Sequence, residues 1–334
     1  ADDLLTEKSE LGRLLFYDPV LSSNNERACA SCHNADKAFT DGRPKSLAID
    51  GENHIQRNAP TLLNSVYTER IIYDLREEQL ERQIKHVVLD ANEFSTDFLK
   101  IAEKLEQSEE YQQRFLSAYP LAKISKYSIS NALAAYLSTL TSFNSPFDQY
   151  IRGETAEIDP AVERGFNLFM GKAACGTCHF APTFSGLVPP YFQESESEVL
   201  GVPVAPESDQ IDPDQGRMAS TRPRDEAPFY QYSFKTTTVR NIALTTPYMH
   251  NGAYTDLKSV LDFYNKGGGA GLGIDLPYQT LAPDPLNLTD GEIDDLIAFM
   301  ESLTDTSKVG SPPTELPVFT GQPELNQRPI GGAY

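Results

Sequence analysis

The chain has 334 residues, of which 40% are hydrophobic and 23% are charged, and its net charge at pH 7 is −20. This length suits two domains of ordinary size, and no run of 18 apolar residues is present that would span a membrane. The acidity argues against nucleic acid or anionic lipid as partners and weakly favours a basic docking partner. The start at Ala1, without a charged and apolar leader, fits a mature exported protein whose signal peptide has been removed.

Helical periodicity dominates the sequence, and few segments alternate as strands do. Residues 143–153 contain Pro146 and Gly153 and are interpreted as a connection, residues 187–229 as long loops, and the Pro-rich tail from 311 as an extended segment. The sequence therefore predicts a mainly α fold. The expected helices cover residues 77–89, 95–105, 109–116, 129–140 with Ser128 as N-cap, 160–170, 256–264 and 289–300, the last opened by a capping box at Thr289–Glu292.

All four cysteines belong to one motif, C-x-x-C-H, which occurs twice. This motif is the attachment sequence of c-type haem, in which two thiols add to the porphyrin vinyl groups and the next residue places an imidazole on the iron. A redox C-x-x-C pair or a zinc site is the alternative, but the wide separation of the pairs fits no usual zinc-finger spacing. The sequence thus predicts two covalently bound c-type haems. Their ligating residues are Cys29, Cys32 and His33 in the first copy and Cys175, Cys178 and His179 in the second, with both histidines on iron.

The two motifs have similar surroundings. Gly12, Leu15 and Phe16 precede the first motif with the same internal spacing as Gly165, Leu168 and Phe169 before the second. This similarity indicates an internal duplication with one haem in each half. We therefore expect two cytochrome c-like haem domains, over residues 1–152 and 153–305, and an extended tail over 306–334 that packs back on the first domain.

With these motifs, the chain resembles the bacterial di-haem cytochrome c peroxidases and their MauG-like relatives, and the resemblance extends over nearly its whole length. The family's fold is consistent with two helical haem domains, and its activity is the reduction of hydrogen peroxide. Besides the two haem motifs, the resemblance is carried by residues 11–16, 21–22, 39–42, 57–61, 74, 93, 147–150, 240–241 and 247–252.

The resemblance implies a distal pocket over the N-terminal haem. Glu93, in Asn92-Glu93-Phe94, is similar to the family's catalytic glutamate. A carboxylate there can take a proton from bound peroxide and return it to the leaving oxygen. Gln83, on the preceding predicted helix, matches a second residue of that pocket. An ordinary surface charge and a solvent-facing glutamine are the alternative interpretations of these two positions.

The resemblance also implies a calcium ion between the haems. Asn58 resembles its side-chain ligand, and the backbone carbonyls of Thr245 and Pro247 would add further oxygen ligands, with water completing the shell. Asn58 has an alternative role as the residue that begins the turn before Ala59-Pro60.

The chain departs from the peroxidases at the second axial ligand of the C-terminal haem. The peroxidases place a methionine fourteen residues after the histidine of the P-Y-x-H-x-G segment, and counting from His250 gives Tyr264, as in the MauG branch. A phenolate stabilises ferric or higher states, whereas a thioether favours ferrous iron. Tyr264 would thus let this haem hold an oxidising equivalent as high-valent iron. Met249 and Met218 are competing ligands, and a packed aromatic is the alternative role of Tyr264.

Two further departures concern the path between the haems and the resting state. The family usually has Trp where this chain, which contains no Trp, has Tyr73. Tyr73 would then relay charge between the haems, although tyrosine tends to lose a proton on oxidation. His54 lies near the loop whose histidine blocks the N-terminal haem in many resting peroxidases, but it is closer to Asn58 than the family pattern suggests, and we expect an open site. His86, on an apolar helical stripe, is expected to be structural.

These features predict a periplasmic peroxidase-type oxidoreductase that reduces hydrogen peroxide at the N-terminal haem. Electrons would be drawn through the C-terminal His179/Tyr264 haem, with a MauG-like use of high-valent iron to oxidise a partner protein. An ordinary cytochrome c peroxidase with a small cytochrome or cupredoxin as donor is one alternative, and a non-enzymatic di-haem electron carrier is another. The sequence is compatible with a homodimer and does not name the donor or the protein substrate.

Overall fold

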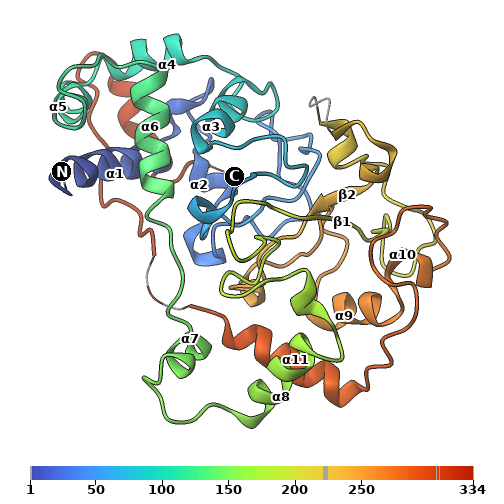
Figure 1. The fold of residues 1–334 in the computed structure, drawn as a ribbon. Coiled ribbons are helices and arrows are strands. Elements are labelled where there is room, and N and C mark those ends of the chain that lie inside the picture. Colours follow the sequence, from blue (N-terminus) through green and yellow to red (C-terminus); the bar gives the residue numbers. More distant parts are fainter. Residues whose placement is uncertain (1, 221–224, 306, 308, 334) are drawn as a thin grey trace.

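The computed structural model describes residues 2–220, 225–305, 307 and 309–333. Helices make up most of the regular structure and lie in two groups at opposite ends of the molecule (Figure 1). Within the described residues there is one two-stranded antiparallel sheet, formed by β1 (Ser197–Val199) and β2 (Ser233–Lys235). The prediction of a mainly α fold is confirmed.

The first helical group is built on the contact between α1 (Asp2–Tyr17) and α6 (Lys126–Leu137). The helices approach so closely at Gly12 that a Cβ there would lie 1.9 Å from the carbonyl oxygen of Ala132. Because interiors are close-packed, a side chain at this position would force the two helices apart. The group is completed by α2 (Cys29–Cys32), α3 (Leu80–Leu89), α4 (Phe98–Leu105) and α5 (Glu109–Ala118).

The second helical group contains a contact of the same kind between α8 (Pro160–Met170) and α11 (Asp290–Ser302). A Cβ at Gly165 would lie 1.9 Å from the carbonyl oxygen of Asp295. Gly12 and Gly165 are the glycines that stand at matching positions ahead of the two haem motifs, so the matched flanks build the same helix contact in both halves. The group also contains α7 (Pro146–Ile151), α9 (Leu257–Asn265) and α10 (Gly268–Gly271).

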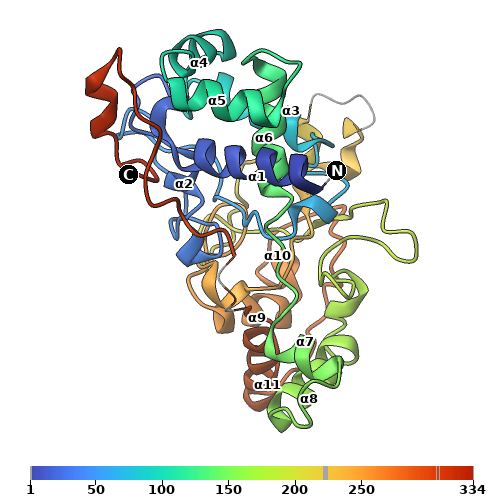
Figure 2. The ribbon, with the colours of Figure 1, turned by 90° about the vertical axis from the view of Figure 1, so that its left-hand side faces the viewer.

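The buried apolar side chains form two clusters. One draws on residues between 11 and 140, and the other on residues between 147 and 303. Phe319 and Leu325, from the tail, belong to the first cluster, and the tail runs beside the N-terminal helices in Figure 2. Arg328 donates hydrogen bonds of 2.6 and 2.7 Å to both carboxylate oxygens of the buried Asp18. The proposed domain boundaries and the internal duplication stay predictions.

Two local expectations are wrong. Residues 143–153, expected as a connection, contain α7, because Ser145 and Asp148 form a capping box and Pro146 takes a first-turn position where its missing N–H costs little. The N-cap of α6 is Ser125 and not Ser128. The hydroxyl of Ser128 instead accepts a hydrogen bond of 3.0 Å from the backbone N–H of Ser125, as the third residue of a capping box does.

Candidate functional site

The first C-x-x-C-H motif forms the single turn of α2, and the main chain orients its histidine. His33 is the C-cap of this turn, and its Nδ1 atom lies 2.9 Å from the carbonyl oxygen of Phe39. Phe39 has a φ of 60°, which turns the chain back toward the motif. When Nδ1–H donates to this carbonyl, Nε2 is left free to bind a metal, which is the usual arrangement of a ligating histidine.

The second motif has the same arrangement. The Nδ1 atom of His179 lies 3.4 Å from the carbonyl oxygen of Phe184, whose φ of 46° is also positive. Burial lowers the pKa of both His33 and His179. Both imidazoles are therefore neutral at neutral pH, and the neutral ring is the form that binds a metal.

The cysteines complete the donor set at each motif. All four are free thiols, and burial raises the pKa of Cys29 and Cys175 to about 12. Two thiols followed by an imidazole that a carbonyl orients are what covalent attachment of c-type haem requires. The residues at both motifs fit a haem.

Glu93 lies in the turn after α3, close to the first motif. Burial is the main cause that raises the pKa of the Cys29 thiol, and the charges of Cys32 and Glu93 add to it. Burial raises the pKa of Glu93 to about 7; the carboxylate of Asp90 adds to this effect, and Arg76 opposes it. A carboxyl group that is half ionised near neutral pH can both accept and return a proton.

Backbone contacts hold the Glu93 turn against the end of α3. The N–H of Phe94 donates to the carbonyl oxygen of Val87 at 3.3 Å. Gln83 lies one helical turn before Val87, and its buried Oε1 atom has no hydrogen-bond partner among the described residues. Because an unpartnered buried amide oxygen is costly, the position suits a pocket in which a bound molecule supplies the donor.

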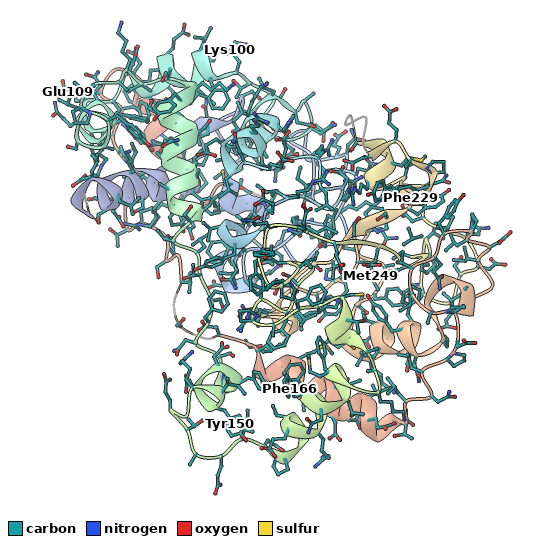
Figure 3. All side chains as sticks on the ribbon, in the orientation of Figure 1. Lys100, Glu109, Tyr150, Phe166, Phe229 and Met249 are labelled. Carbon is teal, nitrogen blue, oxygen red and sulfur yellow. The ribbon has the colours of Figure 1, made fainter. Side chains whose placement is uncertain are left out.

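Helix α9 brings Tyr264 to the second motif. Burial raises the pKa of its phenol, and the thiols of Cys175 and Cys178 add to this effect. Met218 lies in a single 3-10 turn (Arg217–Ala219), and Met249 in the turn after Pro247 (Figure 3). The choice among these three side chains as iron ligand stays a prediction.

Tyr73 and Asn58 meet at the junction between the two halves. The hydroxyl of the buried Tyr73 donates to Oδ1 of Asn58 at 3.2 Å, and the backbone N–H of Asn58 donates to the carbonyl oxygen of His250 at 2.7 Å. Asn58 therefore lies against the segment that contains Thr245 and Pro247. The three expected calcium ligands come from segments that meet here, and the calcium site itself stays a prediction.

Two histidines that the sequence singles out are exposed. His54 lies in a loop opposite Leu47, and the open N-terminal site expected from the sequence stays a prediction. The side chain of His86 is 52% exposed and lies 2.7 Å from the carboxylate of Glu77. The expectation that His86 belongs to an apolar stripe is wrong, because its position on α3 faces solvent.

Several contacts at the junction have no local signature in the sequence. Arg57 donates hydrogen bonds of 2.6 and 2.8 Å to the carboxylate of Asp214, and it also pairs with Asp74. The ring of His250 stacks on Phe234 with centroids 3.6 Å apart. Asp214 lies in the Pro- and Asp-rich segment 187–229, whose lack of periodicity gives no sign of which acids are buried.

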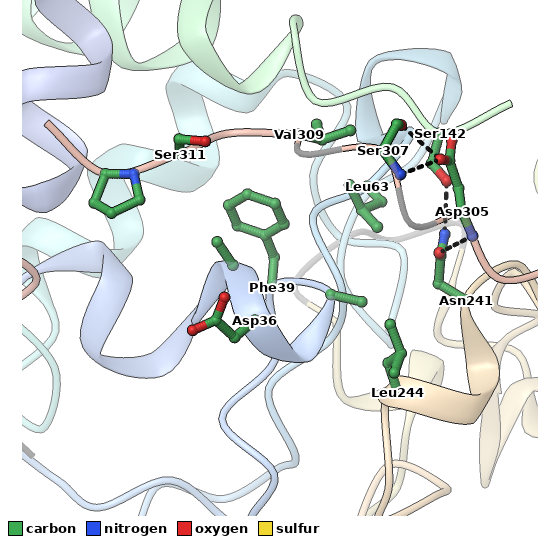
Figure 4. Close-up of a pocket in the computed structure, with 13 residues that line it drawn as sticks. Asp36, Phe39, Leu63, Ser142, Asn241, Leu244, Asp305, Ser307, Val309 and Ser311 are labelled. Carbon is green, nitrogen blue, oxygen red and sulfur yellow. Dashed lines mark hydrogen bonds between the residues drawn. The ribbon is translucent and has the colours of Figure 1, made fainter. Parts of the chain in front are cut away.

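A cavity of about 380 Å³ lies behind Phe39, the residue whose carbonyl orients His33 (Figure 4). On one wall, the backbone N–H of Asp305 donates to Oδ1 of Asn241, and Nδ2 of Asn241 donates to the hydroxyl of Ser142, at 2.9 and 2.8 Å. The cavity is lined by neither Glu93 nor Tyr264 nor any cysteine, so it is separate from the candidate site.

Known proteins are similar to this chain over most of its length. Residues 6–156 match the family model of the di-haem cytochrome c peroxidases. The chain is 31% identical to the methylamine utilization protein MauG of Methylophilus methylotrophus over 307 residues. This alignment covers 91% of this chain and 84% of that protein. The chain belongs to the di-haem cytochrome c peroxidase and MauG family. Membership makes it a peroxidase-type oxidoreductase, and the family implies two c-type haems.

Both branches of the family are similar to this chain. The cytochrome c551 peroxidase of Pseudomonas aeruginosa is 30% identical over 325 residues, which cover 97% of this chain and 85% of that enzyme. Among solved structures, a MauG-like protein associated with microbial copper homeostasis superposes with a TM-score of 0.78 at 30% identity, over 92% of this chain and 91% of that one. None of the described helices is long and apolar enough to cross a bilayer.

Proposed function

We propose that this family member is a MauG-like periplasmic enzyme. It reduces hydrogen peroxide at its N-terminal haem and uses the oxidising equivalents, through its C-terminal haem, to oxidise residues of a partner protein. The observation that carries this proposal is that the thiols of Cys175 and Cys178 act electrostatically on the buried phenol of Tyr264, which helix α9 carries. The periplasmic location and a calcium ion held by Asn58, Thr245 and Pro247 are part of the proposal and rest on the family.

The chain's residues at the N-terminal site handle protons. A haem held by Cys29, Cys32 and His33 would supply redox-active iron that can bind peroxide. The carboxylate of Glu93 accepts a proton from the entering peroxide and delivers it to the oxygen that leaves as water. The Oε1 atom of Gln83 accepts a hydrogen bond from the bound molecule, and the carbonyl of Phe39 keeps the His33 ring in place. Over a full cycle, one peroxide, two protons and two electrons give two waters.

The residues between the two sites move charge. Tyr73 is buried at the junction, and its hydroxyl donates to Asn58. A tyrosine that loses an electron also tends to release its proton, and the hydrogen bond to Asn58 Oδ1 fixes the direction of the Tyr73 hydroxyl. At the C-terminal site, a phenolate donor from Tyr264 favours the oxidised states of iron that a thioether would disfavour.

An ordinary cytochrome c peroxidase is the second candidate, and the match to the Pseudomonas enzyme over 97% of this chain favours it. In that case a small cytochrome or cupredoxin supplies the electrons and the task is peroxide removal. A plain electron carrier would need both irons to be closed by protein ligands, so a high-spin ferric signal in the resting EPR spectrum separates the enzymes from the carrier.

The deciding experiment adds peroxide to the diferric protein and to Tyr264→Met, with Tyr254→Phe as a control that removes a neighbouring buried phenol. We expect the wild type and the control to hold two oxidising equivalents without a donor, visible in optical and EPR spectra, and to turn over reduced cytochrome c slowly. Tyr264→Met should lose this state and gain turnover with reduced cytochrome c. Fast wild-type turnover with such a donor, unchanged in Tyr264→Met, would favour the second candidate.

A further inference from the structure

Lys235 ends β2 at the junction between the two halves. Its backbone N–H donates to the carbonyl oxygen of Tyr73 at 2.7 Å, and across the strand pair it faces Ser197 of β1. These contacts fix the backbone of Lys235 beside the residue on the proposed path between the haems.

The ammonium group of Lys235 has no counter-charge in the described chain. Within residues 2–220, 225–305, 307 and 309–333, no hydrogen bond or ion pair reaches its Nζ atom. Burial lowers the pKa of Lys235 to about 8, and no carboxylate opposes this effect. The nearest acid across the strand pair is no partner, because Glu198 pairs with Phe234 and therefore lies on the opposite face from Lys235.

Lys104 is a second lysine whose pKa burial lowers, and its ammonium group has hydrogen-bond partners. Burial also lowers the pKa of Lys104 to about 8. Its Nζ atom, however, donates to the carbonyl oxygen of Ser22 and to Oδ1 of Asn25, both at 2.7 Å, and the carboxylate of Asp18 acts on it. Lys235 has the burial of Lys104 without its contacts.

Lys235 also shares a feature with the residues at the two haem motifs. The side chains of His33, His179 and Tyr264 are partly exposed, and burial shifts the pKa of each of them. Lys235 is likewise partly exposed, and burial lowers its pKa. Because no acid of the described chain pairs with this partly desolvated ammonium, an anionic ligand would stabilise it.

We propose that Nζ of Lys235 binds a propionate carboxylate of one of the two haems, at the junction beside Tyr73. Propionates are the anionic groups that a haem carries, and an ammonium forms a charge-assisted hydrogen bond to a carboxylate. The cation then favours the reduced state of that haem, because reduction adds negative charge. Lys235 is a haem-positioning and potential-setting residue. The inference needs the two haems of the family and is independent of the MauG-like assignment.

The test measures the midpoint potentials of both haems by spectroscopic titration of the di-haem protein, which requires no turnover. Lys235→Met should lower the midpoint potential of one haem by about 59 mV, which corresponds to a tenfold change in the equilibrium of a one-electron reduction. Lys235→Arg should stay near the wild type because it keeps the charge. Lys104→Met is the matched control, because Lys104 is a partly buried lysine with hydrogen-bond partners of its own, and it should leave both potentials unchanged.

Resonance Raman spectra give a second readout, because propionate-bending bands respond to hydrogen bonding. The propionate bands of one haem should shift in Lys235→Met and in Lys235→Gln. If the methionine variant does not accumulate with both haems, Lys235→Gln replaces it in both measurements. Unchanged potentials and bands in these variants would overturn the proposal. Equal changes in Lys104→Met would overturn it as well, since they would reflect a general disturbance of the fold.

Discussion

Replacing Glu93 by Gln tests the acid–base chemistry of the N-terminal site. The substitution keeps the size of the side chain and removes its ability to take up a proton. We expect the rate of reaction with peroxide to fall by about 10²- to 10⁴-fold, the usual contribution of a positioned general acid–base group. In the wild type, the rate should rise about tenfold per pH unit below pH 7 and level off above it, because the pKa of Glu93 is about 7 and the ionised form accepts the proton.

The same shift predicts an effect on stability. Burial raises the pKa of Glu93 from 4.5 to about 7, and one pKa unit corresponds to 1.36 kcal/mol. The native state keeps its proton up to about pH 7, whereas the unfolded chain loses it near pH 4.5. The resulting stabilisation is complete below pH 4.5 and is lost as the pH rises through 7. Glu93→Gln should therefore be more stable than the wild type at pH 9, by at most about 3 kcal/mol, and equal to it at pH 4.

Stopped-flow mixing of the diferric protein with peroxide between pH 5 and 9, and urea unfolding at pH 4 and 9, measure the two effects. Asp90→Asn should move the midpoint of the rate profile below pH 7, because the Asp90 carboxylate helps to raise the pKa of Glu93. Glu103→Gln, on the exposed face of α4, is the control and should change nothing. If Glu93→Gln kept the wild-type rate and its pH dependence, another group would be the proton acceptor.

Three further outcomes follow from packing and from the proposed calcium ion. Gly165→Ala should lower the unfolding free energy by about 1–3 kcal/mol or more, because its Cβ would meet a backbone carbonyl. Gly291→Ala has open space around it and should be neutral or stabilise by up to about 1 kcal/mol. Thermal unfolding of the two variants compares these effects. Phe319→Ala should cost about 3–5 kcal/mol in the first core, and Val318→Ala, whose side chain is 55% exposed, little; equal costs would contradict the packing. Calcium removal by a chelator should slow electron transfer between the haems, as should Asn58→Ala, and unchanged rates in both would argue against the site.

The sequence predicted those parts of the fold that depend on local chemistry. The expected helix over 160–170 coincides with α8, and the capping box of Thr289 and Glu292 opens α11 as expected. Both follow from apolar spacing and from caps that a few neighbouring residues decide. The matched flanks of the haem motifs also pointed to Gly12 and Gly165, whose close helix contacts explain why glycine stands there.

Other parts were hidden because long-range contacts decide them. Arg57 and Asp214 are 157 residues apart, and nothing local marks either as a partner of the other. The sequence places His86 on an apolar helical stripe, yet the face of α3 that turns inward is decided by what packs against it, and His86 faces solvent. The segment 143–153 contains Pro146 and Gly153, residue types that usually end helices, but Pro146 stands at the start of α7, where it is tolerated, and Gly153 follows the helix.

The position of the C-terminal tail against the N-terminal core affects the order in which the two cores can pack. Phe319 and Leu325 help to fill the N-terminal core, and Arg328 neutralises Asp18 within it. The half that begins the chain thus closes only after the final residues have emerged, whereas the other half draws its core from the continuous stretch 147–303. Proteolytic trimming of the C-terminus would consequently loosen the half that contains Glu93 and spare the one that contains Tyr264.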